Sequence, residues 1–585
     1  MWIAFLLICS LIVGTRSAAT VTSHQLQMEA NAIINSRWWN TSDAYFNISH
    51  RCNWYDILCN EAGSIKAINI DLWGYQLVTL NLSTLNYSAF NNLESLVISS
   101  VGLQGTIPKQ IGHLSKLTYL DLSDNYLEGQ VPPSLGNLSK LTHLDLSDNN
   151  LVGQVPPSLG NLSKLTHLDL FENFLKGKIP HSLGNLTKLT HLNLSNNYLE
   201  GQIPPSLGNL ERLKHLDISY NNLEGSIPYE LGFIKNINRV YLYHNRISGE
   251  IPPSIGNLTK LTHLVVSQNS LVGEVPPSLG NLTQLKHLYI SNNYIEGCIP
   301  FKLGFFKKLT TLSLSNNRFK GEIPSSLGNL KHLQQLNISH NNIQGSLPFE
   351  LAFLKNIITL DLSHNRLNGN FPNFLTNLTQ LEYLDISYNF LIGSLPYNFD
   401  QLTKLQVLML NNNSVSGTFP ISLTNLSQLE TLDISHNLIH GVLPSKFFPF
   451  IDYKISIDLS HNLISGEIPS ELGHFQSLIL SNNKLTGTIS KSICNVYFMN
   501  ISYNYLRGPI PTCVDPDIMI GNKDLCTNFS YKRIHFQFQP CPPSKKSNKV
   551  KSHVFIALAM LICLILSLSI IICLKLCIAM LRTSK

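Results

Sequence analysis

LTYLDLSDNYLEGQVPPSLGNLSK, residues 117–140, is a unit that returns along most of the chain at intervals of 24 residues. Fifteen glycines keep this interval without exception from Gly105 to Gly441, and Gly466, Gly487 and Gly508 follow at slightly altered spacing. A fixed period of about 20 to 50 residues is typical of a solenoid, in which one small unit stacks on the next. The period therefore outweighs what a length of 585 residues suggests about the number of domains.

Each unit carries a hydrophobic pattern that predicts a short strand. In the quoted unit, the spacing L-x-x-L-x-L-x-x-N is formed by Leu117, Leu120, Leu122 and Asn125. Leu120 and Leu122 are two residues apart, so on an extended chain they point to one face and the residues between them to the other. We therefore expect a strand that buries its leucine face.

An asparagine follows the predicted strand in almost every unit. It stands at seventeen positions, in steps of 24 from Asn125 to Asn437 and then at Asn462, Asn483 and Asn504. A buried polar side chain is costly unless it is hydrogen-bonded. We therefore expect an asparagine ladder, in which each amide pairs with the backbone of its own turn and of the neighbouring turn.

The second half of the unit indicates which type of repeat this is. Stretches such as GQVP at 129–132 and GQIP at 201–204, each leading into SLGNL, resemble the plant extracellular type of leucine-rich repeat over roughly residues 25–545. The resemblance implies an α/β-type solenoid, a leucine-rich-repeat superhelix with a concave parallel β-sheet and short second strands or 3₁₀ turns behind it. Such a surface is long and suited to contacts, and it is a poor container for a catalytic pocket.

Both ends of the chain carry apolar segments. Residues 2–13 are apolar and small residues follow, which predicts a secretory signal with cleavage near Ala18. Residues 554–574 hold 21 residues without a charge, enough to cross a bilayer. Because the signal commits the repeats to export, we expect a single-pass type I protein of the plasma membrane. The expected organisation is a signal peptide (1–18), an N-terminal cap (19–64), about twenty repeats (65–512), a C-terminal cap and juxtamembrane segment (513–552), a transmembrane helix (553–575) and a short cytoplasmic tail (576–585).

Cysteines gather at the two ends of the repeats. The segment CNWYDILC at 52–59 resembles the N-terminal cap of plant receptors, with Asp56 in place of the family's glycine, and GNKDLC at 521–526 is similar to the C-terminal cap. The resemblance implies the pairs Cys52–Cys59 and Cys526–Cys541. Cys494 and Cys513 are nearly one repeat apart, so adjacent coils could bring them within bonding range, although sequence alone proves no connectivity. Cys298 is left over, as a free thiol or as half of an intermolecular bridge.

The composition fits an exported surface protein. Only 13% of the residues are charged, so Asn, Ser and Thr must solvate the surface. The net charge of +6 comes largely from lysines next to the apolar helix and does not indicate a nucleic-acid partner. The N-L-[ST] stretch of the unit creates a glycosylation sequon in many repeats, and the asparagine of each sequon lies outside the predicted strand. The expected glycosylation sites are Asn137, Asn161, Asn185, Asn257, Asn281, Asn377 and Asn425.

Three side chains of each strand point outward: the residue before the second leucine of the unit, the residue between the second and third leucines, and the residue after the third. Residues at the same position in successive strands form a first, a middle and a last column, and these columns locate a candidate binding site. The middle column is largely acidic, but Tyr241, Val265 and Tyr289 interrupt it. Tyr and Arg are the residues most enriched in binding hot spots. The alternative is drift under weak sequence constraint. The predicted ligand-binding residues are Arg239, Tyr241, Tyr243, Val265, Tyr289, His263, His287 and Phe171.

Four histidines, at 143, 167, 191 and 215, occupy the first column of consecutive strands. Duplication of a Leu-Thr-His-Leu consensus accounts for them, so we expect no metal site. A pH sensor and a metal site stay open as alternatives, because imidazoles about 5 Å apart beside acidic residues invite both.

No catalytic motif or cofactor site is present in the sequence, which predicts a non-enzyme. The resemblance to receptor-like proteins, or to receptor-kinase ectodomains, implies an extracellular peptide or protein ligand and a co-receptor kinase that signals in defence or development. The chain ends about ten residues after the apolar helix, so we expect signalling to be borrowed from a partner. The alternatives are an inhibitor of secreted microbial enzymes, and a truncated or decoy receptor kinase.

Overall fold

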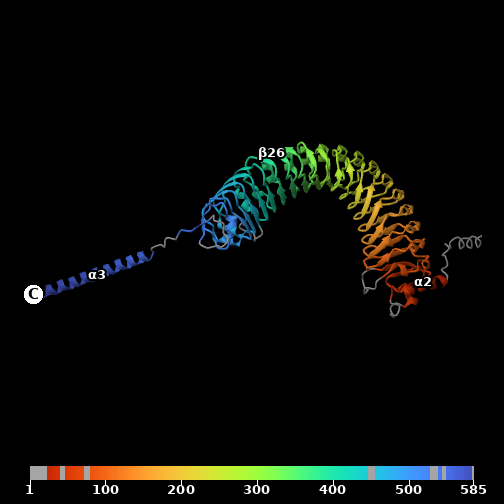
Figure 1. The fold of residues 1–585 in the computed structure, drawn as a ribbon, viewed down its shortest axis with the longest axis horizontal. Coiled ribbons are helices and arrows are strands. Elements are labelled where there is room, and N and C mark those ends of the chain that lie inside the picture. Colours follow the sequence, from red (N-terminus) through yellow and green to blue (C-terminus); the bar gives the residue numbers. More distant parts are fainter. Residues whose placement is uncertain are drawn as a thin grey trace, which may run out of the picture.

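Short strands from successive units line up into one curved array in the computed structural model, which describes residues 23–39, 47–70, 80–445, 455–527, 538–542 and 549–582. The array forms an arch that runs from α2 (Ser23–Ser36) at one end to the last repeats at the other (Figure 1). The expected signal peptide lies outside the described residues.

The inner side of the arch is a 20-stranded sheet. Its first two strands are antiparallel, and from β2 onward each strand pairs in parallel with the strand of the next unit. Its strands are β1 (Ile57–Cys59), β2 (Ile65–Ile70), β3 (Ser95–Ile98), β5 (Tyr119–Asp121), β7 (His143–Asp145), β9 (His167–Asp169), β11 (His191–Asn193), β13 (His215–Asp217), β15 (Arg239–Tyr241), β17 (His263–Val265), β19 (His287–Tyr289), β21 (Thr311–Ser313), β23 (Gln335–Asn337), β25 (Thr359–Asp361), β27 (Tyr383–Asp385), β29 (Val407–Met409), β31 (Thr431–Asp433), β33 (Ser456–Asp458), β35 (Ser477–Ile479) and β37 (Phe498–Asn500).

A second row of short strands and 3₁₀ turns completes each coil. The turns run from η5 (Lys109–His113) to η20 (Lys491–Asn495). The second strands form separate short parallel sheets. They are β4 (Gln104–Thr106), β6 (Tyr126–Gln130), β8 (Asn150–Gly153), β10 (Phe174–Lys178), β12 (Tyr198–Gln202), β14 (Asn222–Glu224), β16 (Ser248–Gly249), β18 (Ser270–Leu271), β20 (Glu296–Cys298), β22 (Arg318–Lys320), β24 (Gln344–Gly345), β26 (Arg366–Asn370), β28 (Phe390–Ile392), β30 (Ser416–Thr418), β32 (Leu438–Val442), β34 (Leu463–Glu467), β36 (Lys484–Thr486), β38 (Arg507–Pro509), β39 (Asp524–Thr527) and β40 (Gln539–Pro540).

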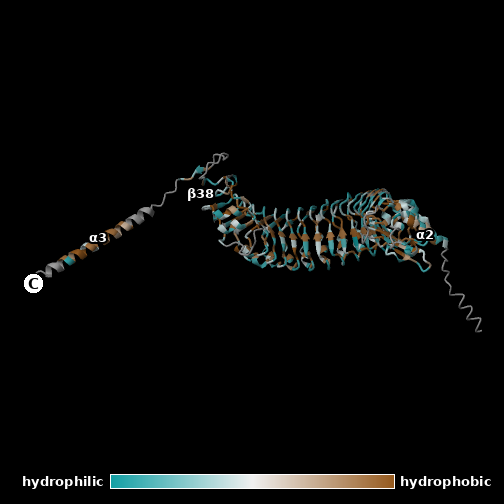
Figure 2. Ribbon diagram, turned by 90° about the horizontal axis from the view of Figure 1, so that it is seen from below, coloured by the Kyte–Doolittle hydropathy of each residue, from teal (hydrophilic) through white to brown (hydrophobic). Residues whose placement is uncertain are grey.

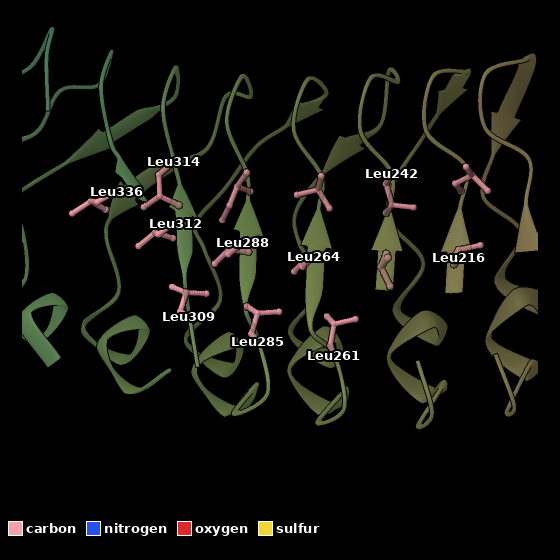
Figure 3. Packing of buried hydrophobic residues seen from close by; sticks show 14 of the residues in the cluster. Leu216, Leu242, Leu261, Leu264, Leu285, Leu288, Leu309, Leu312, Leu314 and Leu336 are labelled. Atoms are coloured by element: carbon pink, nitrogen blue, oxygen red, sulfur yellow. The ribbon is translucent and has the colours of Figure 1, made fainter. Parts of the chain in front are cut away.

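The hydrophobic core is one continuous cluster between these two rows. Leu285, Leu288 and Ile290 of one unit are all 0% exposed, and the equivalent side chains of neighbouring units repeat the arrangement along the arch (Figure 3). The leucines of each coil are fully buried only when adjacent coils cover them, so the repeats are stable as a stack.

The predicted asparagine ladder is present and makes the expected contacts. Asn149 donates from Nδ2 to the carbonyls of Leu146 at 3.3 Å and Ser147 at 2.9 Å in its own turn. It also donates to the carbonyl of Leu122 in the preceding unit at 2.9 Å, while its Oδ1 accepts from the amide of Leu127 at 2.9 Å. One side chain thus satisfies backbone groups of two coils.

Disulfides close both ends, at the pairs expected from the sequence. Cys52–Cys59 lies in the N-terminal cap, and Cys494–Cys513 and Cys526–Cys541 lie at the other end. In the N-terminal cap, Glu29 of α2 is fully buried and accepts a hydrogen bond from the amide of Ile65 at 3.0 Å. Cys298 is free and exposed.

A long apolar helix follows the repeats. This helix, α3 (Lys549–Arg582), contains a 21-residue stretch, Ile556–Leu576, with a mean hydropathy of 3.0. It is long and apolar enough to cross a membrane, and it lies apart from the arch (Figures 1 and 2).

Candidate ligand-binding surface

The aromatic and apolar residues that interrupt the acidic column lie next to one another on the concave sheet. Strands β15, β17 and β19 are in register, so Tyr241 lies beside Val265, and Val265 beside Tyr289. Arg239 is exposed at the edge of this row, whereas the other side chains are half-buried. We call Arg239, Tyr241, Tyr243, Val265 and Tyr289 the aromatic patch.

Histidines frame the aromatic patch. The ring centroids of His263 and His287 lie 4.5 Å apart in a stacked arrangement, and the Tyr241 ring lies 6.1 Å from His263. The Tyr289 ring lies 6.4 Å from His287. The rings of the patch and of these two histidines therefore form a nearly continuous layer on three adjacent strands, a surface that suits recognition of another molecule.

Burial, helped by nearby positive charge, keeps the two histidines beside the patch neutral. Burial lowers the pKa of His263 to about 4, with smaller contributions from positive charge on His287, Arg239 and Lys286. Burial, with Lys286, also lowers the pKa of His287. At neutral pH the positive charges here are therefore those of Arg239 and Lys286.

Phe171 lies outside the aromatic patch but shares a groove with Tyr243. The groove has a volume of about 440 Å³, and serine and asparagine side chains and Asp217 line it together with the aromatic rings. Its third aromatic wall is Tyr220, whose ring lies 5.0 Å from that of Tyr243. Tyr220 does not belong to the outward columns predicted from the sequence, because it follows the strand β13. The sequence could have identified Tyr220 by its position directly before a ladder asparagine. The backbone is left-handed there, with φ of 48° at Tyr220.

Toward the N-terminal end, the first column forms a stack of rings. Tyr119 and His143 lie 4.1 Å apart between centroids, and His143 and His167 lie 4.3 Å apart. The stack continues through His191, at 4.3 Å, to His215, at 4.4 Å. Burial lowers the pKa of His167 to about 4, and repulsion from its histidine neighbours adds to this effect.

A row of carboxylates accompanies the stack. Asp145 accepts hydrogen bonds from the amide of Ser147 at 3.0 Å and from its hydroxyl at 2.6 Å, yet burial raises the pKa of Asp145 to about 6. A second acidic row follows the strands and lines a groove of about 410 Å³ with Asp124, Asp148 and Glu172. The concave surface is thus acidic in its N-terminal repeats and aromatic and basic at β15–β19.

The histidine stack makes a prediction for stability. Burial, with the charges of His191 and Arg239, lowers the pKa of His215 from 6.5 to about 4, while Asp169 opposes this shift. Between these two values the unfolded chain binds more protons than the folded one, so stability falls as the pH falls. We expect His215→Asn to remove about 1 kcal/mol of the loss in unfolding free energy between pH 7 and pH 5, a value discounted for partial solvent exposure. Urea unfolding at both pH values measures this loss, and an unchanged difference would contradict the prediction.

The seven expected glycosylation sites share one location. Each is exposed and is the last residue of a 3₁₀ turn, as Asn137 is in η6 (Pro133–Asn137) and Asn425 in η18 (Ile421–Asn425). Glycans at these positions would leave the concave sheet open.

Comparisons with known proteins agree with this architecture. Residues 79–246, 228–346 and 302–441 match the family described as leucine-rich repeat region, and residues 397–506 match the leucine-rich-repeat domain of the EGF-like domain-containing protein ComC. The leucine-rich repeat receptor-like serine/threonine-protein kinase RGI4 of Arabidopsis thaliana is 35% identical over 101 residues, which make up 17% of this chain and 8% of that protein.

Solved structures extend the similarity over most of the repeats. The plant peptide hormone receptor RGFR1, solved in complex with RGF2, is 31% identical with a TM-score of 0.65, and the match covers 81% of this chain and 82% of that one. The leucine-rich-repeat ectodomain of the Arabidopsis receptor kinase HAESA, in complex with an N-terminally extended IDA peptide hormone, is 28% identical with a TM-score of 0.66 and coverage of 86% and 99%.

These findings define the class of the protein: an extracellular array of leucine-rich repeats built as a contact surface. The chain belongs to the leucine-rich-repeat family and, within it, to the plant extracellular receptors.

Proposed function

We propose that this chain is a cell-surface receptor-like protein that binds a peptide or protein ligand on its concave sheet and signals through a partner kinase. The observation that carries the proposal is the aromatic patch on β15–β19, the point where a largely acidic surface turns aromatic and basic. The similar peptide hormone receptor RGFR1 was solved in complex with RGF2, and the similar HAESA ectodomain in complex with an IDA peptide hormone.

The proposed partner is a co-receptor kinase, and the proposed process is defence or development. HAESA, 29% identical with a TM-score of 0.61 over 86% of this chain and 98% of its own, was solved with IDA and the co-receptor SERK1. We propose that α3 anchors this chain in the plasma membrane with its repeats outside. An epitope ahead of the repeats should then be accessible to antibody on intact protoplasts, whereas staining only after permeabilisation would overturn this orientation.

The test of the binding site is a double substitution in the aromatic patch. A peptide selected from a random library on the secreted wild-type ectodomain serves as the probe. Arg239→Ala combined with Tyr241→Ala should weaken its binding about thirtyfold, because loss of hot-spot residues costs about 2 kcal/mol or more. Isothermal titration or biolayer interferometry measures the change.

A matched control variant changes residues in the same first and middle columns, further along the sheet. Val407→Ala combined with Met409→Ala changes equivalent positions on β29, outside the aromatic patch. This control should bind the probe as the wild type does. Unchanged binding by the patch variant, or equal losses in both, would remove the patch as the ligand site.

A further inference from the structure

The histidine stack and the carboxylate row belong to one repeated motif on adjacent strands. Strands β7 and β9 each carry histidine, leucine and aspartate in that order, and they pair in register, so that His143 lies beside His167 and Asp145 beside Asp169. Strand β11 continues the histidine row with His191. Because alternate residues of a strand share a face, all these imidazoles and carboxylates point to the concave side.

Donor atoms from this motif converge in two overlapping sets. In the first set, one donor atom each from His143, Asp145 and His167 lie within 4.8 Å of one another, and in the second set the same holds for His167, Asp169 and His191. In the second set, Nε2 of His191 lies 3.8 Å from Oδ2 of Asp169. All five residues are half-buried on the floor of the sheet.

Two nitrogens and an oxygen at this separation need only a small adjustment to meet one ion. Zinc–nitrogen and zinc–carboxylate bonds are about 2.0 to 2.2 Å long, so donors on one ion stand roughly 3 to 4 Å apart. The rings are stacked, and rotation about the broad χ2 torsion of histidine turns neighbouring nitrogens toward the carboxylate beside them. The paired strands hold the backbone of these residues in place, and the rings turn the nitrogens toward the carboxylate.

We propose that β7, β9 and β11 form a binding site for one divalent transition-metal ion, of which zinc is the representative. Imidazole with carboxylate is a donor set that suits zinc, copper and nickel, and water completes the coordination at this open surface. The two sets share His167, so a single ion occupies the site. Duplication of the repeat accounts for the histidines without a metal, and the in-register convergence of donor atoms is the observation that favours one.

A second pair of stacked histidines on the same sheet provides an internal control for this site. His263 and His287 also stack in register on neighbouring strands, with centroids 4.5 Å apart. Val265 and Tyr289 stand where the first motif has Asp145 and Asp169. This second pair of histidines therefore has the same rings without the carboxylates.

The experiment is zinc titration of the secreted ectodomain, purified through a tag without histidines. We expect saturable binding of about one zinc ion per molecule, and a loss of affinity of at least tenfold in His167→Asn, which removes a ligand from both sets. A paired His263→Asn and His287→Asn variant should bind zinc as the wild type does. Thermal unfolding of each variant without zinc shows whether it folds.

A second variant keeps all the histidine rings and removes the two carboxylates. Asp145→Asn combined with Asp169→Asn preserves the histidine stack, and Asn193 in the same column shows that asparagine fits this position. It too should lose at least tenfold in zinc affinity. No saturable binding by the wild type, unchanged affinity in either motif variant, or an equal loss in the His263 and His287 control would each overturn the site. These readouts are independent of the peptide probe, so they stand apart from the proposed receptor function.

Discussion

Replacement of Asn293 by alanine is expected to lower the free energy of unfolding of the ectodomain by about 3 kcal/mol. Asn293 donates from Nδ2 to the carbonyls of Val266 at 3.1 Å, Ile290 at 3.0 Å and Ser291 at 3.2 Å, and its Oδ1 accepts from the amide of Leu271 at 3.0 Å. Alanine leaves all four backbone groups without this partner inside the stack. Each buried polar group that loses its hydrogen bond costs about 1 to 3 kcal/mol.

Urea unfolding followed by circular dichroism measures this effect, because the coils unfold with their neighbours. The control is Asn342→Ala, which changes an exposed asparagine outside the ladder and should shift the free energy by less than about 0.5 kcal/mol. If Asn293→Ala were as stable as this control, the ladder would contribute no stability in this protein.

Replacement of Gly328 by alanine is expected to destabilise the ectodomain by about 3 kcal/mol, the upper end for overpacking. Gly328 lies in η14 (Ser325–Asn329), against η15 (Phe349–Phe353) of the next coil. A Cβ at this position would lie 2.2 Å from the carbonyl oxygen of Glu350. The obstructing atom belongs to the backbone, so the two coils must move apart and loosen the leucine packing between them.

Ser325→Ala serves as the matched control, because it changes an exposed residue of the same turn. It should leave the unfolding midpoint almost unchanged, whereas Gly328→Ala should lower it by several degrees. A midpoint for Gly328→Ala equal to that of the control would mean that the turns adjust without cost.

Much of the surface could be placed from sequence because the repeat converts distance along the chain into position in space. Tyr241 and Val265 are 24 residues apart, and the fixed period predicts that they lie on adjacent strands, as they do. The same reasoning brought Cys494 and Cys513 together on adjacent coils. Both inferences need only the period and the strand, which are local properties.

Other parts of the surface depended on backbone conformation that the period does not reveal. Tyr220 joins Phe171 and Tyr243 in one groove because the residue before each ladder asparagine adopts a left-handed conformation. The convergence of His167 with Asp145 and Asp169 likewise depends on how rings and carboxylates orient on a twisted sheet.

The sequence by itself determined the solenoid, its leucine core and its asparagine ladder, because each is set by contacts that repeat between neighbouring units. The closed ends followed from the cysteines that gather there and from the family resemblance of those segments. Only the tertiary structure decided which outward side chains meet, since the turn of the backbone after each strand and the angle of each ring set distances of a few ångströms. The grooves and the convergence of imidazole and carboxylate groups on the concave face are therefore properties of the folded stack, whereas the existence of that face follows from the repeat.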